Sequence, residues 1–401
     1  MVCHGIMKSA TLHSPSFAQV MPPTPASATA YGCYRQTRFF SSLDGLRAMS
    51  ILAVIWHHTA SAGTAHTILH EGNQGVSLFF VISGFLIVTL LLRSKARFGT
   101  FSLAKFWGRR SLRILPVYYG VLGLYVGLAF FLERDPVYRQ AFFGNLPAFA
   151  TFTSNWFVSL KNPRVIFYFA WSLAAEEQFY LIWPWFERFL RGARPLLVAF
   201  GALLITQSVA IATSAKNPAA LPLALRIISS VPAAILLGVI LAHLLNSPAT
   251  FRFWYGIIGR RGSALAALVL TLAALGARPA LGSAADLVTA VSMMLLVAAC
   301  VVREDNDLAR ILSTTVVAWI GKVSYGMYLF HMIAVNLIHR LASALGHSSP
   351  YLDFAGGVLL AVGMASLSYL FFESRLLKVK DRLFRENAAP GLLPVGRTPT
   401  V

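Results

Sequence analysis

The chain has 401 residues, of which 57% are hydrophobic and only 12% are charged, against roughly 25% charged in soluble domains. Lys and Arg number 34 and Asp and Glu 15, so the net charge is +19. So low a charge density cannot hydrate the surface of a globule of this size, which excludes a soluble enzyme, a disordered chain and a disulfide scaffold. The three cysteines, Cys3, Cys33 and Cys300, show no metal-binding spacing. The composition predicts an all-α membrane helix bundle without a bound metal.

Residues 1–40 are rich in Pro, Ser, Ala and Thr and contain no signal-peptide core, so they are predicted to form a flexible cytoplasmic tail. A transmembrane domain is predicted over 41–376 and a basic cytoplasmic tail over 377–401. The aromatic stretch Leu146–Leu160 is predicted to be an outer loop or a re-entrant piece. Ten stretches approach the roughly 20 apolar residues of a membrane-spanning helix: 46–60, 75–92, 114–132, 167–187, 196–213, 227–246, 263–277, 283–302, 323–345 and 354–373.

Basic residues are distributed unevenly among the connections between these stretches. With the N-terminus inside, the inner segments carry 26 Lys and Arg and the outer segments carry 8. Such an excess predicts about ten spans with both termini in the cytoplasm. The positive charge is therefore interpreted as a topology signal in a lipid bilayer, and no nucleic-acid partner is expected.

The first predicted span contains two polar residues, Arg47 and His58, that are eleven positions apart. Eleven residues rise about 16 Å and turn only ~20° beyond three full turns of a helix, so the two side chains share one face. This spacing places Arg47 at the inner rim and His58 near the middle of the membrane. His57 points elsewhere. An ionisable residue inside a span indicates function, although His58 could equally hydrogen-bond a neighbouring helix as part of the packing.

The predicted inner loop before the third span, KFWGRRSLRILP, holds Lys105 and three arginines, Arg109, Arg110 and Arg113. Arg109 and Arg113 are four residues apart and share one face if the segment is helical. Guanidinium groups match the geometry of phosphate oxygens, so the cluster could bind a polyanion. The alternative is simple anchoring at the inner membrane surface.

The fourth predicted span carries two adjacent carboxyl groups, Glu176 and Glu177, with Trp171 and Tyr180 beside them. Carboxyl groups in a membrane helix need Arg or His partners or a polar cavity. Together with the aromatic rings they suit a hydroxyl-rich acceptor. The alternative is a structural ion pair within an interfacial aromatic belt.

The ninth predicted span contains a second intramembrane histidine, His331. It lies about 12 Å inside the span, which brings it near the depth of His58. A structural pairing of His331 with a carboxyl group is the alternative.

These residues fall within five ordered motifs, and with them the chain resembles the acyltransferase-3 family of bacterial integral-membrane O-acyltransferases. Members of that family O-acetylate surface glycans and some small molecules. The resemblance extends from Ser42 to Glu373. The matching segments are LDGLRA with the later His58, GVSLFFVISGFLI, RRSLRILPVYY, WSLAAEEQFYLIWP and GKVSYGMYLFH.

The resemblance implies a multi-pass protein of the bacterial inner membrane that transfers an acyl group, usually acetyl, from cytoplasmic acyl-CoA to a hydroxyl group of a glycan. It implies acyl-CoA as a co-substrate and no permanently bound cofactor. Direct transfer and an acyl-histidine intermediate both stay open. The implied catalytic residues are His58, Glu176, Glu177 and His331, the implied donor-binding residues are Arg47, Arg109, Arg110 and Arg113, and the implied acceptor-binding residues are Trp171 and Tyr180.

Two features depart from the family pattern. The final glutamate often stands two residues before a proline, whereas Glu373 is followed by Ser374 and Arg375. Many relatives also carry a soluble esterase-like domain, and we expect transfer to occur without one in this chain. Two alternative functions remain: acylation of a small lipophilic acceptor such as a macrolide or lipid, and non-enzymatic export of lipids or glycans.

Overall fold

The computed structural model describes residues 25–37, 39–59, 68–159, 165–213, 221–347 and 349–384, and over these residues it contains helices and no strand. Within these described ranges, six helices are long and apolar enough to cross a bilayer, or up to nine if each of three bent helix pairs is one span. Helix α7 (Trp171–Phe189) is outside that count and carries three glutamates and an arginine. The predicted all-α polytopic fold is confirmed, and the orientation of its termini stays a prediction.

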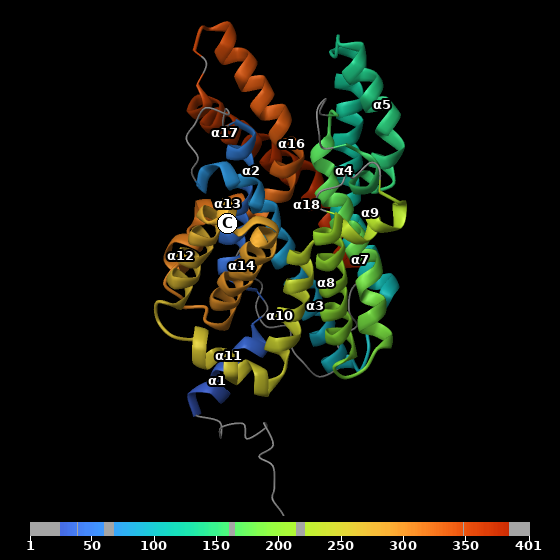
Figure 1. Cartoon of the computed structure of the whole chain (residues 1–401). Helices are drawn as coiled ribbons and strands as arrows, with labels where there is room; N and C mark the ends of the chain where they lie inside the picture. Colours follow the sequence, from blue (N-terminus) through green and yellow to red (C-terminus); the bar gives the residue numbers. More distant parts are fainter. Residues whose placement is uncertain are drawn as a thin grey trace, which may run out of the picture.

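Each of the ten predicted stretches falls on a helix or a bent helix pair. Helices α1 and α11 lie together at one end of the bundle, and α5 runs beside α4 at the opposite end (Figure 1). The long helices are α2 (Ser41–Thr59), α3 (Gly75–Phe98), α4 (Leu103–Phe131), α8 (Arg194–Thr213), α10 (Ala233–Asn246), α12 (Ser263–Gly276), α14 (Ala285–Val302), α16 (Thr315–Ala344) and α17 (Pro350–Ser368). The shorter ones are α1 (Pro25–Gln36), α5 (Pro136–Ala150), α6 (Ser154–Phe157), α9 (Leu223–Ser229), α11 (Pro248–Ile258), α13 (Arg278–Leu281), α15 (Ala309–Leu312) and α18 (Ser374–Leu383).

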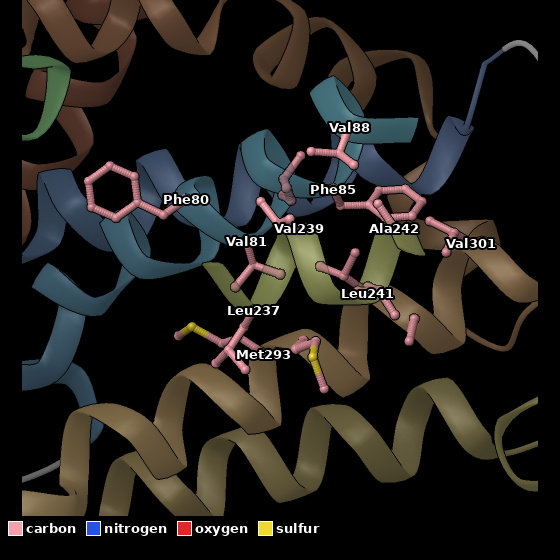
Figure 2. Packing of buried hydrophobic residues seen from close by; sticks show 14 of the residues in the cluster. Phe80, Val81, Phe85, Val88, Leu237, Val239, Leu241, Ala242, Met293 and Val301 are labelled. Carbon is pink, nitrogen blue, oxygen red and sulfur yellow. The ribbon is translucent and has the colours of Figure 1, made fainter. Parts of the chain in front are cut away.

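The first apolar cluster of the core forms around α10, which packs between α3 and α14 (Figure 2). Apart from His243 and the terminal Asn246, helix α10 consists of apolar residues, which is typical of a helix surrounded by other helices. Its approach to α3 depends on two glycines, Gly84 and Gly238. A Cβ atom at Gly84 would lie 2.2 Å from the Ile235 carbonyl oxygen, and one at Gly238 would lie 2.3 Å from the Val81 carbonyl oxygen. The two backbones therefore touch directly.

Replacing Gly238 by alanine is expected to destabilise the bundle by about 1–3 kcal/mol, because the added methyl group forces two backbones apart. The melting temperature of the purified protein in detergent measures this loss. The matched control is Gly120→Ala on α4, where no atom lies within 4 Å of the new Cβ. That variant should be neutral or slightly stabilised. Equal melting temperatures for the two variants would show that the α3–α10 contact is not as close as described.

The second apolar cluster joins the C-terminal half of α2 to α4, α16 and α17. Its centre is aromatic and includes Tyr118, Phe142, Phe149 and Phe167, all almost fully buried. Helix α7 contributes to both clusters, with Leu173 in the second and Tyr180 in the first. Glu176 and Glu177 lie between these two residues of α7, where the two clusters meet.

The N-terminal segment differs from the predicted flexible tail. Residues Pro25–Gln36 form α1, which packs on α11 through the rings of Tyr31 and Phe251, 5.2 Å apart. The Tyr31 hydroxyl also donates to the Asn246 carbonyl oxygen at 2.6 Å. The composition of this segment concealed the helix because its anchors are two tyrosines among small residues. The rest of the predicted tail, residues 1–24, lies outside the described residues.

The region predicted to be an outer loop contains an additional helix, α5. Its start has a sequence signal: the Asp135 side chain accepts a hydrogen bond from the Val137 N–H at 2.8 Å, and Pro136 occupies the first turn. The stretch Leu146–Leu160 comprises the end of α5 and the short α6, and residue 160 itself is outside the described part.

The arginine cluster lies inside a helix and not in a loop, because α4 begins at Leu103, eleven residues before the predicted span. Ser102 caps this helix by accepting a hydrogen bond from the Lys105 N–H at 3.3 Å. At the other end of the chain, α18 extends helical structure to Leu383, into the predicted basic tail. The residues from 385 onward lie outside the described part.

Candidate active site

A polar cavity lies where the two apolar clusters meet. Five helices line it: α2, α3, α4, α7 and α16. Helix α16 comes close to α2 because Gly321 has no side chain; a Cβ there would lie 1.8 Å from the Asp44 carbonyl oxygen. The charged side chains that line the cavity are Arg47, Arg110, Arg113, Glu176, Glu177 and Lys322. Four cations face two carboxylates, so the lining favours an anionic ligand.

Glu176 is held by neighbouring side chains. Its Oε1 accepts hydrogen bonds from the Ser83 hydroxyl of α3 and from the Tyr180 hydroxyl one turn along α7. The Arg110 guanidinium lies over the Tyr180 ring, 4.0 Å from its centroid. Glu176 therefore fixes the ring on which Arg110 rests.

Glu177 has a different environment. It lines the cavity, and no hydrogen bond joins its carboxylate to another residue in the described part of the chain. Arg110 is the cation whose charge acts on it. We expected these carboxyl groups to have an arginine partner or a polar cavity. Glu176 and Glu177 both line the cavity, together with Arg110.

The three arginines of α4 do not share one environment. Arg110 and Arg113 line the cavity, whereas the Arg109 guanidinium donates to the Phe384 carbonyl oxygen beyond α18. Arg109 and Arg113 are four residues apart in one helix, as predicted, but only Arg113 lines the cavity. The physical reason is the C-terminal segment, which packs across this side of α4. Its Phe384 ring occupies the space that a Cβ at Gly108 would fill.

Arg113 is exposed within the cavity although it lies about 15 Å along α4 from Leu103. Its guanidinium makes no hydrogen bond or ion pair with any residue that the structure describes. Arg47 lines the same cavity and pairs with Asp44 at 3.2 Å. A guanidinium group has five donors, so Arg113 presents a strong site for an anion.

His58 and His331 meet, as their predicted depths suggest. Their ring centroids are 4.9 Å apart in an edge-to-face arrangement. The His58 Nδ1–H donates to the Val54 carbonyl oxygen at 2.8 Å, and the His331 Nδ1–H donates to the Tyr328 carbonyl oxygen at 2.6 Å. A backbone carbonyl can only accept, so each neutral ring keeps its proton on Nδ1 and its lone pair on Nε2.

The histidine pair does not line the cavity. Tyr328 and Ser172 lie between the cavity and the histidine pair. Both line the cavity, and their hydroxyl oxygens are hydrogen-bonded at 2.6 Å. The Tyr328 ring in turn contacts the His331 ring, with centroids 5.4 Å apart. Tyr328 and Ser172 thus stand between the charged side chains of the cavity and the His331 ring.

The two aromatic residues predicted to bind an acceptor are separated as well. Tyr180 lines the cavity, but Trp171 packs on Phe80, with ring centroids 6.2 Å apart, and is outside the lining. Sequence analysis assigned no role to Lys322, Ser172 and Tyr328, all of which line the cavity. All three residues belong to motifs noted in the sequence: Lys322 and Tyr328 to GKVSYGMYLFH, and Ser172 to WSLAAEEQFY.

A comparison with known families identifies this architecture. The profile of a family described as an acyltransferase domain matches residues 40–373. The chain belongs to this acyltransferase family. The resemblance expected from the five motifs is confirmed. The match covers the whole cavity and the histidine pair, while α1 and α18 lie outside it.

Individual relatives of this acyltransferase-family chain share less than a third of its residues. It is 28% identical over 369 residues to a Staphylococcus aureus (strain COL) protein named "Putative O-acetyltransferase". That alignment covers 86% of this chain and 58% of the relative. It is 29% identical over 324 residues to the peptidoglycan O-acetyltransferase OatA of Listeria monocytogenes, covering 75% of this chain and 50% of the relative. The chain thus spans between half and three fifths of the length of these relatives. No solved structure gives a significant match.

Proposed function

We propose that the chain is an O-acetyltransferase of the bacterial cytoplasmic membrane, which transfers an acetyl group from cytoplasmic acetyl-CoA to a hydroxyl group of a cell-surface glycan. The observation that carries the proposal is the Arg113 guanidinium, which faces a cavity shared with Arg47 and Arg110 and makes no hydrogen bond or ion pair with a described residue. Membership of the acyltransferase family supports the reaction type. The name of the Listeria relative supports a glycan acceptor.

The arginines would hold the anionic end of the donor. In the predicted orientation α4 begins at the cytoplasmic face, so Arg110 and Arg113 lie about 10 and 15 Å inward from its first residue. Phosphate groups bound by these side chains would leave the thioester directed towards Ser172 and Tyr328. Arg109, which already binds the Phe384 carbonyl oxygen, is not part of this donor site.

The glutamates would have separate tasks. Glu176 positions Arg110 through Tyr180, because it accepts a hydrogen bond from the Tyr180 hydroxyl and the Arg110 guanidinium lies over the Tyr180 ring. Glu177 is available to accept hydrogen bonds from N–H or O–H groups of a ligand in the cavity. Its negative charge also offsets part of the charge of Arg110.

His58 would act as the general base. Its Nε2 lone pair takes the proton of the acceptor hydroxyl while the hydroxyl oxygen bonds to the thioester carbonyl carbon. The C–S bond breaks, the coenzyme leaves as a thiolate, and the imidazolium returns the proton to that thiolate. His331, packed edge-to-face against His58, holds the ring and places a second Nε2 lone pair in the same site.

The test is release of coenzyme A from radiolabelled acetyl-CoA by the purified protein, with and without a crude surface-glycan fraction. We expect glycan-stimulated release and an alkali-labile acetyl ester on the glycan. Release that ignores glycan would retain the donor and replace the acceptor by a small molecule. A folded protein that cleaves no thioester, across donors and acceptors, would contradict the proposal.

A further inference from the structure

We propose that Tyr328 and Ser172 form a closed barrier between the charged cavity and the His58–His331 pair, and that this barrier limits hydrolysis of the donor. The inference rests on the proposed function, because it assumes that a thioester in the cavity has to reach His58. It assigns a positioning role to two residues that neither bind the phosphates nor take the proton. We call them the Tyr328–Ser172 barrier.

The barrier is built from three oxygen atoms. The Ser172 and Tyr328 hydroxyl oxygens are 2.6 Å apart, and the Phe169 carbonyl oxygen lies 3.2 Å from the first and 3.0 Å from the second. Each hydroxyl has one proton, so the two protons make two of these three contacts at a time, and both side chains are held without a ligand. Both side chains are buried, with exposed fractions of 4% for Ser172 and 6% for Tyr328.

Tyr328 separates two chemically different spaces. Its side chain lines the cavity beside the arginines and glutamates, and its ring packs against the His331 ring. His331 is fully buried, and its Nε2 has no hydrogen-bond partner in the described part of the chain. The cavity side of the histidine pair is thus covered by Tyr328 and by Phe169, whose ring lies 4.8 Å from that of His331.

The backbone that anchors the barrier has an uncommon conformation. Phe167, two residues before the Phe169 carbonyl, has a φ of 67°, in the left-handed region that bulky residues rarely adopt. Such a residue persists only where its surroundings hold it in place, and this is typical of segments that move or bind ligands. The short turn η2 (Tyr168–Ala170) follows it directly and leads into α7.

This geometry has a consequence for the choice between acceptor and water. With the triangle closed, water in the cavity and a thioester bound there are both kept from the His58 lone pair. Turnover then requires Tyr328 to leave Ser172, which costs the hydrogen bonds of a buried hydroxyl pair. Weakening the triangle should therefore open the path to water as well as to the donor.

The test uses Tyr328→Phe and Ser172→Ala, each of which removes one hydroxyl. The first readout needs no substrate: modification of His331 by diethylpyrocarbonate in the intact purified protein, followed by peptide mass spectrometry. The second is acetyl-CoA hydrolysis without acceptor. We expect both rates to rise about fivefold to tenfold in each variant, the effect of losing roughly one buried hydrogen bond.

Tyr125→Phe is the matched control. Its ring packs on Phe167 and Phe169, with centroids 4.7 and 6.0 Å away, but its side chain is outside the cavity lining. Both rates should stay at the wild-type level in this variant. Melting temperatures confirm that all three proteins are folded, and Ser172→Ala keeps the test decisive if Tyr328→Phe is unstable.

Unchanged His331 modification in both folded variants would overturn the barrier, whatever their activity. Loss of hydrolysis and of transfer together, with His331 still protected, would also overturn it, because the hydroxyl would then act in the chemistry. Faster His331 modification with no thioester cleavage in any protein, wild type included, would support the barrier and refute the proposed function. The two proposals can therefore fail separately.

Discussion

Replacing His58 by alanine is expected to lower acetyl transfer by about 10²- to 10⁴-fold, the contribution of a well-placed general base. The Nδ1–H bond to Val54 fixes the tautomer that leaves Nε2 as the acceptor, so no other atom of the ring can supply this lone pair. Because the side chain is only half-buried, its truncation should leave the bundle folded. Initial rates of acetyl-ester formation on the glycan measure the loss.

The matched control for this variant is His347→Ala. His347 is exposed just beyond the end of α16 and is remote from the cavity, so this change should leave transfer at the wild-type rate. Transfer by His58→Ala within about threefold of wild type would show that the base is elsewhere. Equal losses in both variants would point to general damage to the preparation and would call for a second His58 substitution, His58→Gln.

Replacing Arg113 by alanine is expected to raise the KM for acetyl-CoA about tenfold to a hundredfold with a smaller change in kcat. A hydrogen bond to a charged group contributes roughly 1.5–3 kcal/mol, and Arg113 makes no hydrogen bond or ion pair with a described residue that would compete with the ligand. Arg110 is a poorer choice, since its loss would also leave Glu177 without its cation. Steady-state kinetics over a range of donor concentrations gives the KM.

Arg310→Ala is the control for the loss of one positive charge. Arg310 is exposed in α15, on the side predicted to be cytoplasmic, and is outside the cavity lining. Its KM should equal that of the wild type. If Arg113→Ala also keeps the wild-type KM at low salt, the cavity does not bind the anionic part of the donor, and this half of the proposal is wrong.

Much of the helical frame could be predicted from the sequence because membrane spans depend on apolar length alone. The depth match between His58 and His331 was also predictable, since it follows from helix rise and span order. The helices α1 and α5 were not predicted, because they are stabilised by tertiary contacts, such as that of Tyr31 with Phe251, and hydropathy does not reveal such contacts.

Which residues line the site was harder to predict from the sequence. Helical spacing grouped Arg109 with Arg113, yet spacing cannot show that the Phe384 carbonyl oxygen takes Arg109. In the same way, the pairing of Ser172 with Tyr328 joins residues 156 positions apart in the chain. Contacts of this kind depend on how helices cross, and a single sequence does not specify the crossing.

The charges on α7 also constrain how the protein enters the membrane. A charged side chain at the centre of a helix costs about 3 kcal/mol during insertion, so α7 with its glutamates is a poor substrate for independent insertion. Ser83 and Arg110 precede α7 in the chain, so partners for Glu176 and Glu177 are already synthesised when it emerges. Glu187, however, pairs at 2.8 Å with His243 of α10, which is made later. We therefore expect the integration of α7 to be completed only after α10 has been synthesised.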